Sequence, residues 1–305
     1  MSSKNSSSTR KLKLHSKNKF DLQKKLTIIL FLLVPLALLI IFTYIPLVDM
    51  FKYSTYRWNG YSAPKFIGIN NYKEIFKNPK YFLILRNSIY YFIGSIVQMI
   101  LALLFATIFF YRVKLNNAFK GTLFFPYLLN GVAISFVFLY VFQPDGVLDS
   151  ILMKLGVAEE SLPLWLGDPR IVNISLTFVS VWRYMGQNMV IFGGAMESIG
   201  SEYFEAAEID GANKWQQFKY LIFPSIRGVI SLNLILAVKG AISVYEIPFI
   251  MTNGSGGSMT FLISTLNTAF VDKKIGLASA MGVVLLILIL IVTFIQKAFE
   301  KRRAY

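Results

Sequence analysis

The chain has 305 residues, of which 55% are hydrophobic and 15% are charged, and its formal net charge is +15. Soluble proteins carry about 25% charged residues, so this composition favours an all-α integral membrane protein. Cys is absent and the one His lies at position 15, which excludes disulfides, thiolate zinc sites and Cys or His nucleophiles; we expect no metal site and no catalytic residue.

Residues 1–25 form a Ser-rich tail with eight Lys or Arg, too polar to join a core. The apolar block at 26–48 is longer than a signal-peptide core and lacks a small-residue cleavage site, so we expect a retained transmembrane helix. A helix needs about 20 apolar residues to cross a bilayer. The same criterion predicts five more spans, which are residues 84–110, 121–142, 171–195, 223–245 and 277–296.

The distribution of basic residues predicts the orientation of these six spans. If both termini are cytoplasmic, the inside segments carry 17 Lys or Arg in 71 residues and the outside segments carry 10 in 94. The inside excess follows the positive-inside tendency. We therefore predict a cytoplasmic tail at 1–25, a membrane domain at 26–296 and a cytoplasmic tail at 297–305. The basic residues accompany no nucleic-acid recognition module, so we expect no nucleic-acid partner.

The cytoplasmic connection between the fourth and fifth spans, residues 201–224, has the pattern of two short helices. We expect Ser201 to cap the first helix, and Asp210-Gly211 to end it because Gly accepts the left-handed conformation. The second helix carries an apolar stripe that we expect to pack on the membrane domain; it consists of Trp215, Phe218, Leu221 and Ile222. Five acids against two bases over residues 196–222 favour a protein partner over lipid headgroups.

The stretch EAAEIDGANKWQQFKYLIFP, residues 205–224, resembles the EAA motif of permease subunits of binding-protein-dependent ABC importers. Leu221 and Phe223 depart from the usual Ile and Leu but keep the hydrophobic character. Landmarks similar to those of the carbohydrate-importer branch occur in order along the chain. They are GINNYKEIF (68–76), LRNSIYYF (85–92), VWRYMGQNMVIFGGAMESI (181–199) and YEIPFIMTNGSGGSMTFLISTLNTAF (245–270). In the last of them TNGSGG replaces the usual Thr-x-Gly-Gly-Pro.

This resemblance implies a type I ABC importer permease fold with cytoplasmic coupling helices that dock on an ATP-hydrolysing subunit. It implies a heterodimer with a homologous permease subunit, two ATP-binding cassette subunits, an extracellular solute-binding protein and a carbohydrate substrate, in a prokaryotic cell membrane. The chain has no GxxxxGK[ST] motif, so we expect a transport subunit that is not an enzyme and binds no cofactor, with ATP and Mg²⁺ used by the partner ATPase. The coupling residues implied are Glu205, Ala206, Ala207, Asp210, Gly211, Trp215 and Pro224.

Polar side chains within the spans indicate a substrate site, because they are costly in lipid. Tyr184, Gln187 and Asn188 share one helix face, and an aromatic ring beside amides suits a sugar. The resemblance implies a sugar site among the third, fourth and fifth spans. The full candidate set is Tyr127, Asn130, Trp182, Tyr184, Gln187, Asn188, Ser243, Tyr245 and Glu246. Helix-to-helix hydrogen bonds remain an alternative role for each residue, as does a Lys239–Glu246 pair within one helix.

Two other functional classes stay open on the residues alone. An ion-coupled secondary transporter would use Arg183, Lys239 and Glu246 and would need no ATPase. A membrane enzyme is disfavoured because the spans lack paired carboxylates. The loop NGSGGS, residues 253–258, is either a contact for the extracellular binding protein or a plain linker. Small residues from Gly276 to Gly282 predict that the last span packs on protein at its start.

Overall fold

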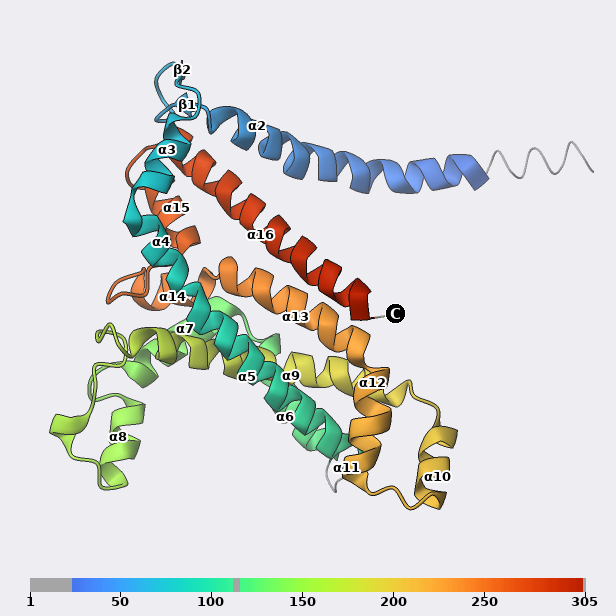
Figure 1. Ribbon diagram of the computed structural model, residues 1–305. Coiled ribbons are helices and arrows are strands. Elements are labelled where there is room, and N and C mark those ends of the chain that lie inside the picture. The colour runs from blue at the N-terminus through green and yellow to red at the C-terminus, as the bar shows by residue number, and fades with distance from the viewer. Residues whose placement is uncertain (1–23, 112–115, 304–305) are drawn as a thin grey trace, which may run out of the picture. The chain divides into compact units, whose positions relative to one another are not determined.

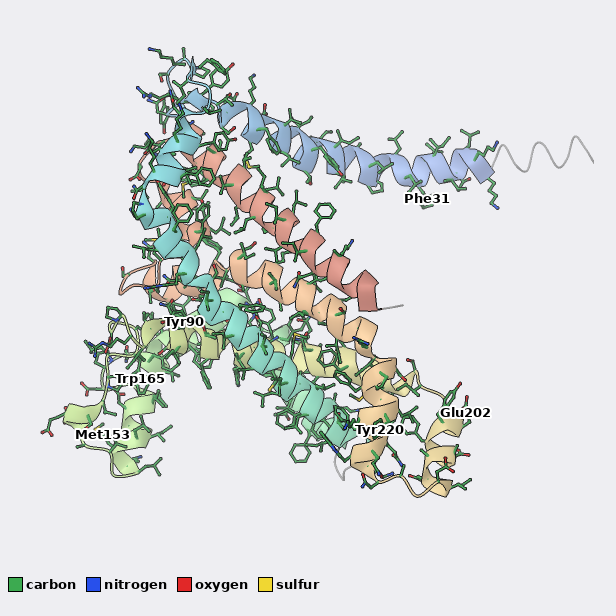
Figure 2. All side chains as sticks on the ribbon, viewed as in Figure 1. Phe31, Tyr90, Met153, Trp165, Glu202 and Tyr220 are labelled. Atoms are coloured by element: carbon green, nitrogen blue, oxygen red, sulfur yellow. The ribbon has the colours of Figure 1, made fainter. Side chains whose placement is uncertain are left out.

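The computed structural model describes residues 24–111 and 116–303, so most of the predicted basic tail and the last two residues lie outside the described residues. The chain divides into two compact units, Met1–Tyr53 and Ser54–Tyr305. In its described part the first unit is one helix, Lys24–Tyr53, which contains the π-helical segment η1 (Ile40–Tyr44) and ends with α2 (Ile45–Tyr53). Within this helix most apolar side chains project outward, such as Phe31 (Figure 2), and its length suits a membrane span.

The second unit begins with a short hairpin and three helices (Figure 1). Strand β1 (Tyr56–Arg57) pairs antiparallel with β2 (Lys65–Phe66). Helix α3 (Asn70–Lys77) follows, and Asn78 then caps α4 (Pro79–Arg86) by accepting a hydrogen bond from the Lys80 N–H. Helix α5 (Ser88–Phe110) continues α4, and together they form an apolar helix of 32 residues. The second predicted span therefore exists but begins earlier than expected.

The third predicted span is not straight. Helices α6 (Asn116–Leu128) and α7 (Gly131–Phe142) meet at an angle of 97°. Asn130 is extended at the break, and its side-chain oxygen accepts a hydrogen bond from the Val132 N–H at 2.8 Å. Asn is a favoured N-cap residue, so it starts a new helix here instead of continuing the old one. The span predicted over 121–142 is therefore present as a bent pair of helices, which counts as one span if α6 and α7 are taken together.

Helix α9 (Val172–Glu197) occupies the place of the fourth predicted span, after α8 (Val147–Lys154) and the 3₁₀ turn η2 (Glu159–Ser161). Helix α9 packs along α5 on one side and α6 on another. At the crossing with α6, a Cβ on Gly186 would meet the backbone carbonyl of Leu123, so only Gly allows this approach. The 26 residues of α9 correspond to about 39 Å, which is long enough to span a bilayer.

The rest of the chain alternates short and long helices. Helix α13 (Arg227–Ile242) breaks at residues 243–245, and the chain then forms α14 (Glu246–Thr252) and α15 (Phe261–Phe270) before α16 (Ile275–Arg303). Helix α16 extends beyond the predicted end of its span at residue 296. Between α9 and α13 lie the four short elements α10 (Ser201–Ile209), α11 (Lys214–Gln217), η3 (Phe218–Ile222) and α12 (Phe223–Ser225).

Within residues 24–111 and 116–303, four helices are long and apolar enough to cross a membrane, and the bent pair α6–α7 makes a fifth if it is taken as one span. The composition of α9 is not apolar enough to join them, because Arg183, Gln187 and Asn188 lie in its middle. The four helices are Lys24–Tyr53, Pro79–Phe110, Arg227–Thr252 and Ile275–Ala298.

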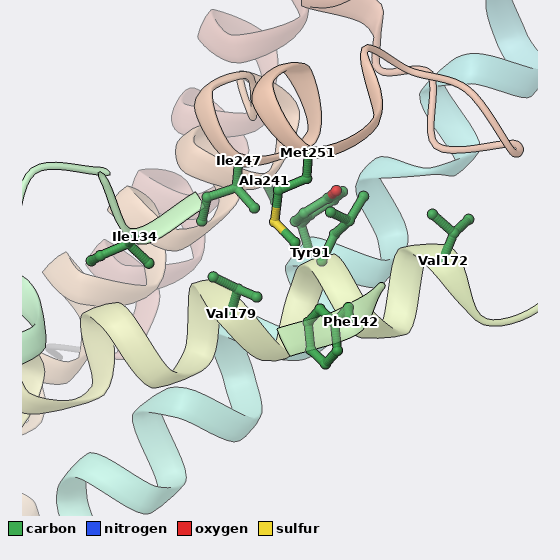
Figure 3. Close-up of a cluster of buried hydrophobic side chains, with 9 residues drawn as sticks. Tyr91, Ile134, Phe142, Val172, Val179, Ala241, Ile247 and Met251 are labelled. Carbon is green, nitrogen blue, oxygen red and sulfur yellow. The ribbon is translucent and has the colours of Figure 1, made fainter. Parts of the chain in front are cut away.

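Three apolar clusters hold the second unit together. The first joins α5, α7, α9, α13 and α14 (Figure 3), so that the broken helices share one core. The second fixes η3 against α5 and α9 through Ile222, which is fully buried. The third packs α16 on α3, α4 and α15. Ala278 and Ala280 of α16 are buried, which confirms that the start of the last span packs on protein.

Candidate functional site

A cavity of about 590 Å³ lies among α5, α9, α13 and the break before α14. It reaches the surface of the unit, since Leu236 on its rim is 61% exposed. Six of the nine residues proposed from the sequence as substrate contacts line this cavity. They are Tyr184, Gln187, Asn188, Ser243, Tyr245 and Glu246.

Two different local structures bring these six residues together. Tyr184, Gln187 and Asn188 lie within one turn of α9, where positions three and four apart share a face. Ser243 and Tyr245 lie in the non-helical break that ends α13, and Glu246 is the first residue of α14. A carboxylate is favourable at that end of a helix because the exposed N–H groups carry positive partial charge. The cavity wall thus combines two aromatic rings, two amides, a hydroxyl and a carboxylate.

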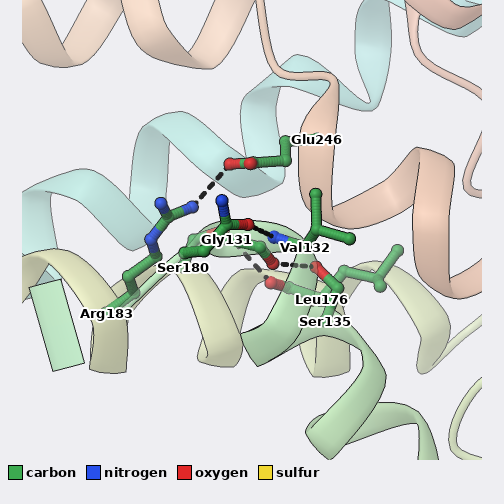
Figure 4. Close-up of polar contacts among 8 residues, drawn as sticks. Gly131, Val132, Ser135, Leu176, Ser180, Arg183 and Glu246 are labelled. Carbon is green, nitrogen blue, oxygen red and sulfur yellow. Dashed lines mark hydrogen bonds and ion pairs between the residues drawn. The ribbon is translucent and has the colours of Figure 1, made fainter. Parts of the chain in front are cut away.

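Glu246 forms an ion pair with Arg183 of α9, at 2.6 Å between Nη1 and Oε2 (Figure 4). The Arg183 side chain is only 11% exposed, whereas that of Glu246 is 40% exposed and faces the cavity. The guanidinium also lies 5.0 Å from the centre of the Tyr184 ring. The alternative of a Lys239–Glu246 pair is therefore not what the structure contains.

Gly131, the first residue of α7, lies directly beneath this ion pair. A Cβ at Gly131 would meet both Nη1 of Arg183 and Oε2 of Glu246. The carbonyl of Gly131 accepts a hydrogen bond from the Ser135 hydroxyl at 2.7 Å, which fixes the first turn of α7 (Figure 4). The ion pair therefore joins α9 and α14 at the point where α7 begins.

Three of the proposed residues do not line the cavity. Tyr127 packs against Tyr184, whose ring lines the cavity, with ring centres 6.1 Å apart. Asn130 uses its side-chain oxygen to cap α7. Trp182 packs edge-on against Phe138, with ring centres 5.2 Å apart, on another face of α9.

Polar residues that the sequence analysis did not select also line the cavity. Tyr91 and Gln98 come from α5, Ser180 from α9 and Asn233 from α13. Gln98 and Asn233 could have been found by the same rule that selected Gln187, because each is an amide inside an apolar span. Tyr91 is 3% exposed, and its hydroxyl has no hydrogen-bond partner in the described part of the chain.

The second candidate region, residues 201–224, is a helix–break–helix unit at the end of α9 opposite to α8 (Figure 1). Helix α10 ends at Asp210, and Gly211 takes a φ of +76°, as the sequence predicted. Ser201 is not the N-cap, because it is already helical and Gly200 precedes it. The second helix, α11, does have a side-chain cap. Asn213 and Gln216 form a reciprocal hydrogen-bonded capping box there, which the sequence analysis missed.

Side-chain contacts of α11 with α10 and with the end of α5 hold this break in place. Lys214 donates a hydrogen bond to Glu208 at 2.6 Å, and this bond holds the pKa of the Glu208 carboxyl below its usual value. Tyr111, at the end of α5, contacts the side chain of Gln217 at 3.3 Å, and burial raises the pKa of its phenol. Gln217 is 2% exposed, so α11 rests on the rest of the unit through this residue.

The apolar stripe predicted for the second helix is only partly buried. Ile222 and Phe218 pack inward, but Trp215 is 68% exposed, so its prediction as a packing residue is wrong. The indole stacks on Phe218 at 5.6 Å and leaves its other face uncovered. Tyr203, at 59%, and Ile209, at 87%, are exposed as well, so α10 and α11 each carry uncovered apolar side chains. Among the proposed coupling residues, Glu205, Ala206, Asp210, Gly211 and Pro224 are also exposed and Ala207 is half-buried.

Known proteins resemble this chain over nearly its whole length. Residues 98–305 match the family model described as binding-protein-dependent transport system inner membrane component. The chain is 31% identical over 286 residues to the probable ABC transporter permease protein YurN of Bacillus subtilis, covering 92% of this chain and 97% of the relative. It is 31% identical over 278 residues to the multiple sugar-binding transport system permease protein MsmF of Streptococcus mutans, covering 89% and 94%.

The fold also occurs in solved structures. A chain of a bacterial ABC transporter involved in the import of the acidic polysaccharide alginate superposes with a TM-score of 0.81 at 16% identity, over 94% of this chain and 99% of that chain. A chain of the bacterial alginate ABC transporter in complex with an alginate pentasaccharide-bound periplasmic protein gives the same TM-score and identity, over 92% and 96%. At this identity the likeness establishes a common fold.

Proposed function

The chain belongs to the family of binding-protein-dependent transport system inner membrane components, and we propose that it is one permease subunit of an ATP-driven sugar importer. The cavity beside α9 is the observation that carries this proposal. Its Tyr184 ring can stack on the apolar C–H faces of a sugar, and Gln187 and Asn188 supply donors and acceptors for hydroxyls. The name of MsmF, a multiple sugar-binding transport system permease, supports the same substrate class.

The charge of the cavity favours an uncharged sugar or oligosaccharide over an acidic one. Of the described residues that line the cavity, Glu246 alone carries a full charge at neutral pH, and Arg183 pairs with it. An anionic sugar would therefore lose its hydration without gaining a cation in exchange, which is unfavourable. The substrate would differ in this respect from alginate, which is acidic.

Six spans would complete the membrane domain if α9 crosses the bilayer with its polar face turned toward the cavity. The cavity opens beside α13, and its polar lining, which includes Gln187 and Asn188, would need a protein cover if this part of α13 lies in the hydrocarbon. A second, homologous permease subunit would supply that cover in a heterodimer, with both termini of this chain in the cytoplasm. The molecule would be a multi-pass protein of a prokaryotic cell membrane.

Residues 201–224 would couple this cavity to ATP hydrolysis. The exposed apolar side chains of α10 and α11, which are Tyr203, Ile209 and Trp215, would be available to a cleft in an ATP-binding cassette subunit. From there α11, η3 and α12 lead directly into α13, which contributes Asn233 and Gly240 to the cavity wall. A displacement of the docked helices would thus move one wall of the cavity, which is the requirement for alternating access. Two such ATPase subunits would use ATP and Mg²⁺, and an extracellular solute-binding protein would deliver the sugar.

An ion-coupled secondary transporter is the alternative, and the ion pair argues against it. A proton- or cation-carrying carboxylate must exchange its ion during the cycle, whereas Glu246 is held by Arg183 at 2.6 Å. Uptake in energised vesicles without nucleotide would be required for this alternative.

The test is sugar uptake by proteoliposomes that contain the complete transporter and its binding protein, with labelled neutral and acidic oligosaccharides. Gly211→Val should strain the left-handed break between α10 and α11, and Glu205→Ala should alter the surface offered to the ATPase. We expect each change to reduce uptake at least about tenfold and to weaken co-purification of the ATPase subunits. The melting temperature of the isolated chain should change little with Glu205→Ala.

Glu202→Ala is the matched control, because it removes an exposed acid from the same helix, outside the EAA motif. If the Glu205 and Gly211 variants retain the ATPase subunits and full uptake, the coupling role is wrong. If uptake requires an acidic oligosaccharide, the assignment of an uncharged substrate is wrong even though the coupling role stands.

A further inference from the structure

A second cavity, of about 520 Å³, lies where the β1–β2 hairpin, α3 and the start of α16 meet. Four basic residues line it, and Glu74 is the one carboxylate among its described lining residues. The ion pairs Lys120–Glu197, Arg183–Glu246 and Lys214–Glu208 lie elsewhere in the chain, and none of them involves this cluster. The four cations, all exposed, are Arg57, Lys65, Lys273 and Lys274.

These four cations lie at positions where neighbouring positive charge makes a cation unfavourable. Arg57 and Lys65 are directly opposite each other in the register of β1 and β2, so two like charges share one face of the hairpin, which is destabilising. Lys273 and Lys274 immediately precede Ile275, the first residue of α16, whose N-terminal end is itself positive. Lys273 also has a φ of +55°, in the left-handed region.

The framework of the cavity keeps these charges together. The Gly276 N–H donates to the Trp58 carbonyl at 3.1 Å, and a Cβ on Gly276 would meet the carbonyl of Tyr56. Asn71, which is buried, donates to the carbonyls of Ser54 and Tyr56 at 2.8 and 2.9 Å. The hairpin is thereby tied to α3 and to α16, so the cations cannot separate by a simple movement of the hairpin. A bound anion would remove the repulsion.

We propose that this cavity binds the phosphate of an anionic phospholipid headgroup. The apolar helix Ile275–Ala298 begins at the cavity, so the cluster lies at the level where a membrane helix leaves the hydrocarbon. Two aromatic side chains on the same hairpin are exposed, Tyr61 at 81% and Phe66 at 66%, and aromatic residues are typical of the headgroup region. Depth and exposed aromatic surface together favour a lipid over a soluble anion.

The experiment measures binding of phosphatidylglycerol and phosphatidylcholine to the purified full chain by native mass spectrometry. The variant carries Arg57→Gln and Lys274→Gln, and the control carries Lys154→Gln and Arg170→Gln, which remove the same charge from exposed positions outside the cavity. We expect phosphatidylglycerol to bind more tightly than phosphatidylcholine. Its affinity should fall roughly 10- to 30-fold in the cavity variant and stay unchanged in the control.

Two further arms identify the source of the anion. If inorganic phosphate alone saturates the cavity and displaces phosphatidylglycerol, the ligand is free phosphate and the lipid proposal fails. If the cavity variant retains phosphatidylglycerol but no longer binds the extracellular solute-binding protein, the cluster is a docking surface for an acidic protein, and the proposal fails again. Equal lipid binding by variant and control also overturns it.

A single substitution, Lys65→Gln, provides a test that does not depend on the folding of the double variant. Lys65→Gln removes one of the two opposed charges and keeps most of the side chain. We expect a higher melting temperature than the wild type in detergent without anionic lipid, because the repulsion is relieved. We also expect a smaller increase on addition of phosphatidylglycerol. A variant whose melting temperature still rises as much with phosphatidylglycerol would contradict the site.

Discussion

At the scale of single residues, the Arg183–Glu246 ion pair packs directly against the Cα of Gly131. The pair joins α9 to the first turn of α14, and α7 begins beneath it. Arg183 is almost fully covered, so a loss of its partner would leave a buried charge uncompensated. The ion pair can therefore form in this geometry only if residue 131 is Gly, which has no Cβ.

We predict that Gly131→Ala displaces the ion pair, because the added Cβ falls on both charged groups. The unfolding free energy should decrease by about 1–3 kcal/mol, less than for a fully buried pair because Glu246 is 40% exposed. Thermal unfolding of the purified chain in detergent measures the change. Gly193→Ala is the control, because a Cβ there meets nothing within 4 Å, and Ala favours the helix. Equal melting temperatures for the two variants would contradict the role of Gly131.

The sequence predicted Glu246 as a site residue but not its partner. Lys239 lies seven positions before Glu246, and an uninterrupted helix would place both on one face. Helix α13 ends at Ile242, however, and the following break turns Glu246 toward α9. Arg183 is 63 residues away in the chain, and that contact depends on how α9 and α14 pack. Local spacing could not have revealed it.

At the scale of elements, hydropathy correctly located the long apolar helices but not the breaks within them. Residues 121–142 are mostly apolar, so their mean hydropathy gives no sign of the 97° bend. The sign lies in one residue, because Asn130 precedes Gly131 and can cap a new helix. The left-handed break at Gly211, by contrast, was predictable because Asp-Gly is a strong local signal.

Substitutions of Asn130 can separate its role as a helix cap from its proposed role as a substrate contact. As the cap of α7, its side-chain oxygen accepts the Val132 N–H at 2.8 Å, so Asn130→Ala should cost about 1 kcal/mol of stability. Asn130→Ser should restore most of that loss, because a hydroxyl also caps a helix. Thermal unfolding and sugar uptake are measured for both variants. If the serine variant is stable yet takes up no sugar, the Asn130 amide contacts the substrate, as the sequence analysis proposed.

At the scale of the whole molecule, composition alone identified a membrane protein, and the polar residues inside apolar spans indicated six residues of the cavity wall. What the sequence could not supply is the assembly of the cavity from α5, α9, α13 and the break before α14. Those contacts join residues from Tyr91 to Leu262 and depend on which helices pack together. The exposed rim on α13 could not be predicted for the same reason, because only the packed structure shows which apolar residues, such as Leu236, stay uncovered.

The last prediction concerns alternating access, and the absence of Cys from the sequence makes it directly measurable. Single substitutions Gln187→Cys in the cavity, Ser255→Cys in the NGSGGS loop and Ser201→Cys at the start of α10 report three positions, with no other thiol on this chain to be labelled. In sealed proteoliposomes with the loop outside, a membrane-impermeant thiol reagent should label Ser255→Cys in every state and Ser201→Cys only after permeabilisation. Gln187→Cys should change its labelling rate at least about tenfold between nucleotide-free and ATP-trapped transporter. A constant rate at position 187, with both reference positions behaving as expected, would rule out a cavity that opens to alternate sides.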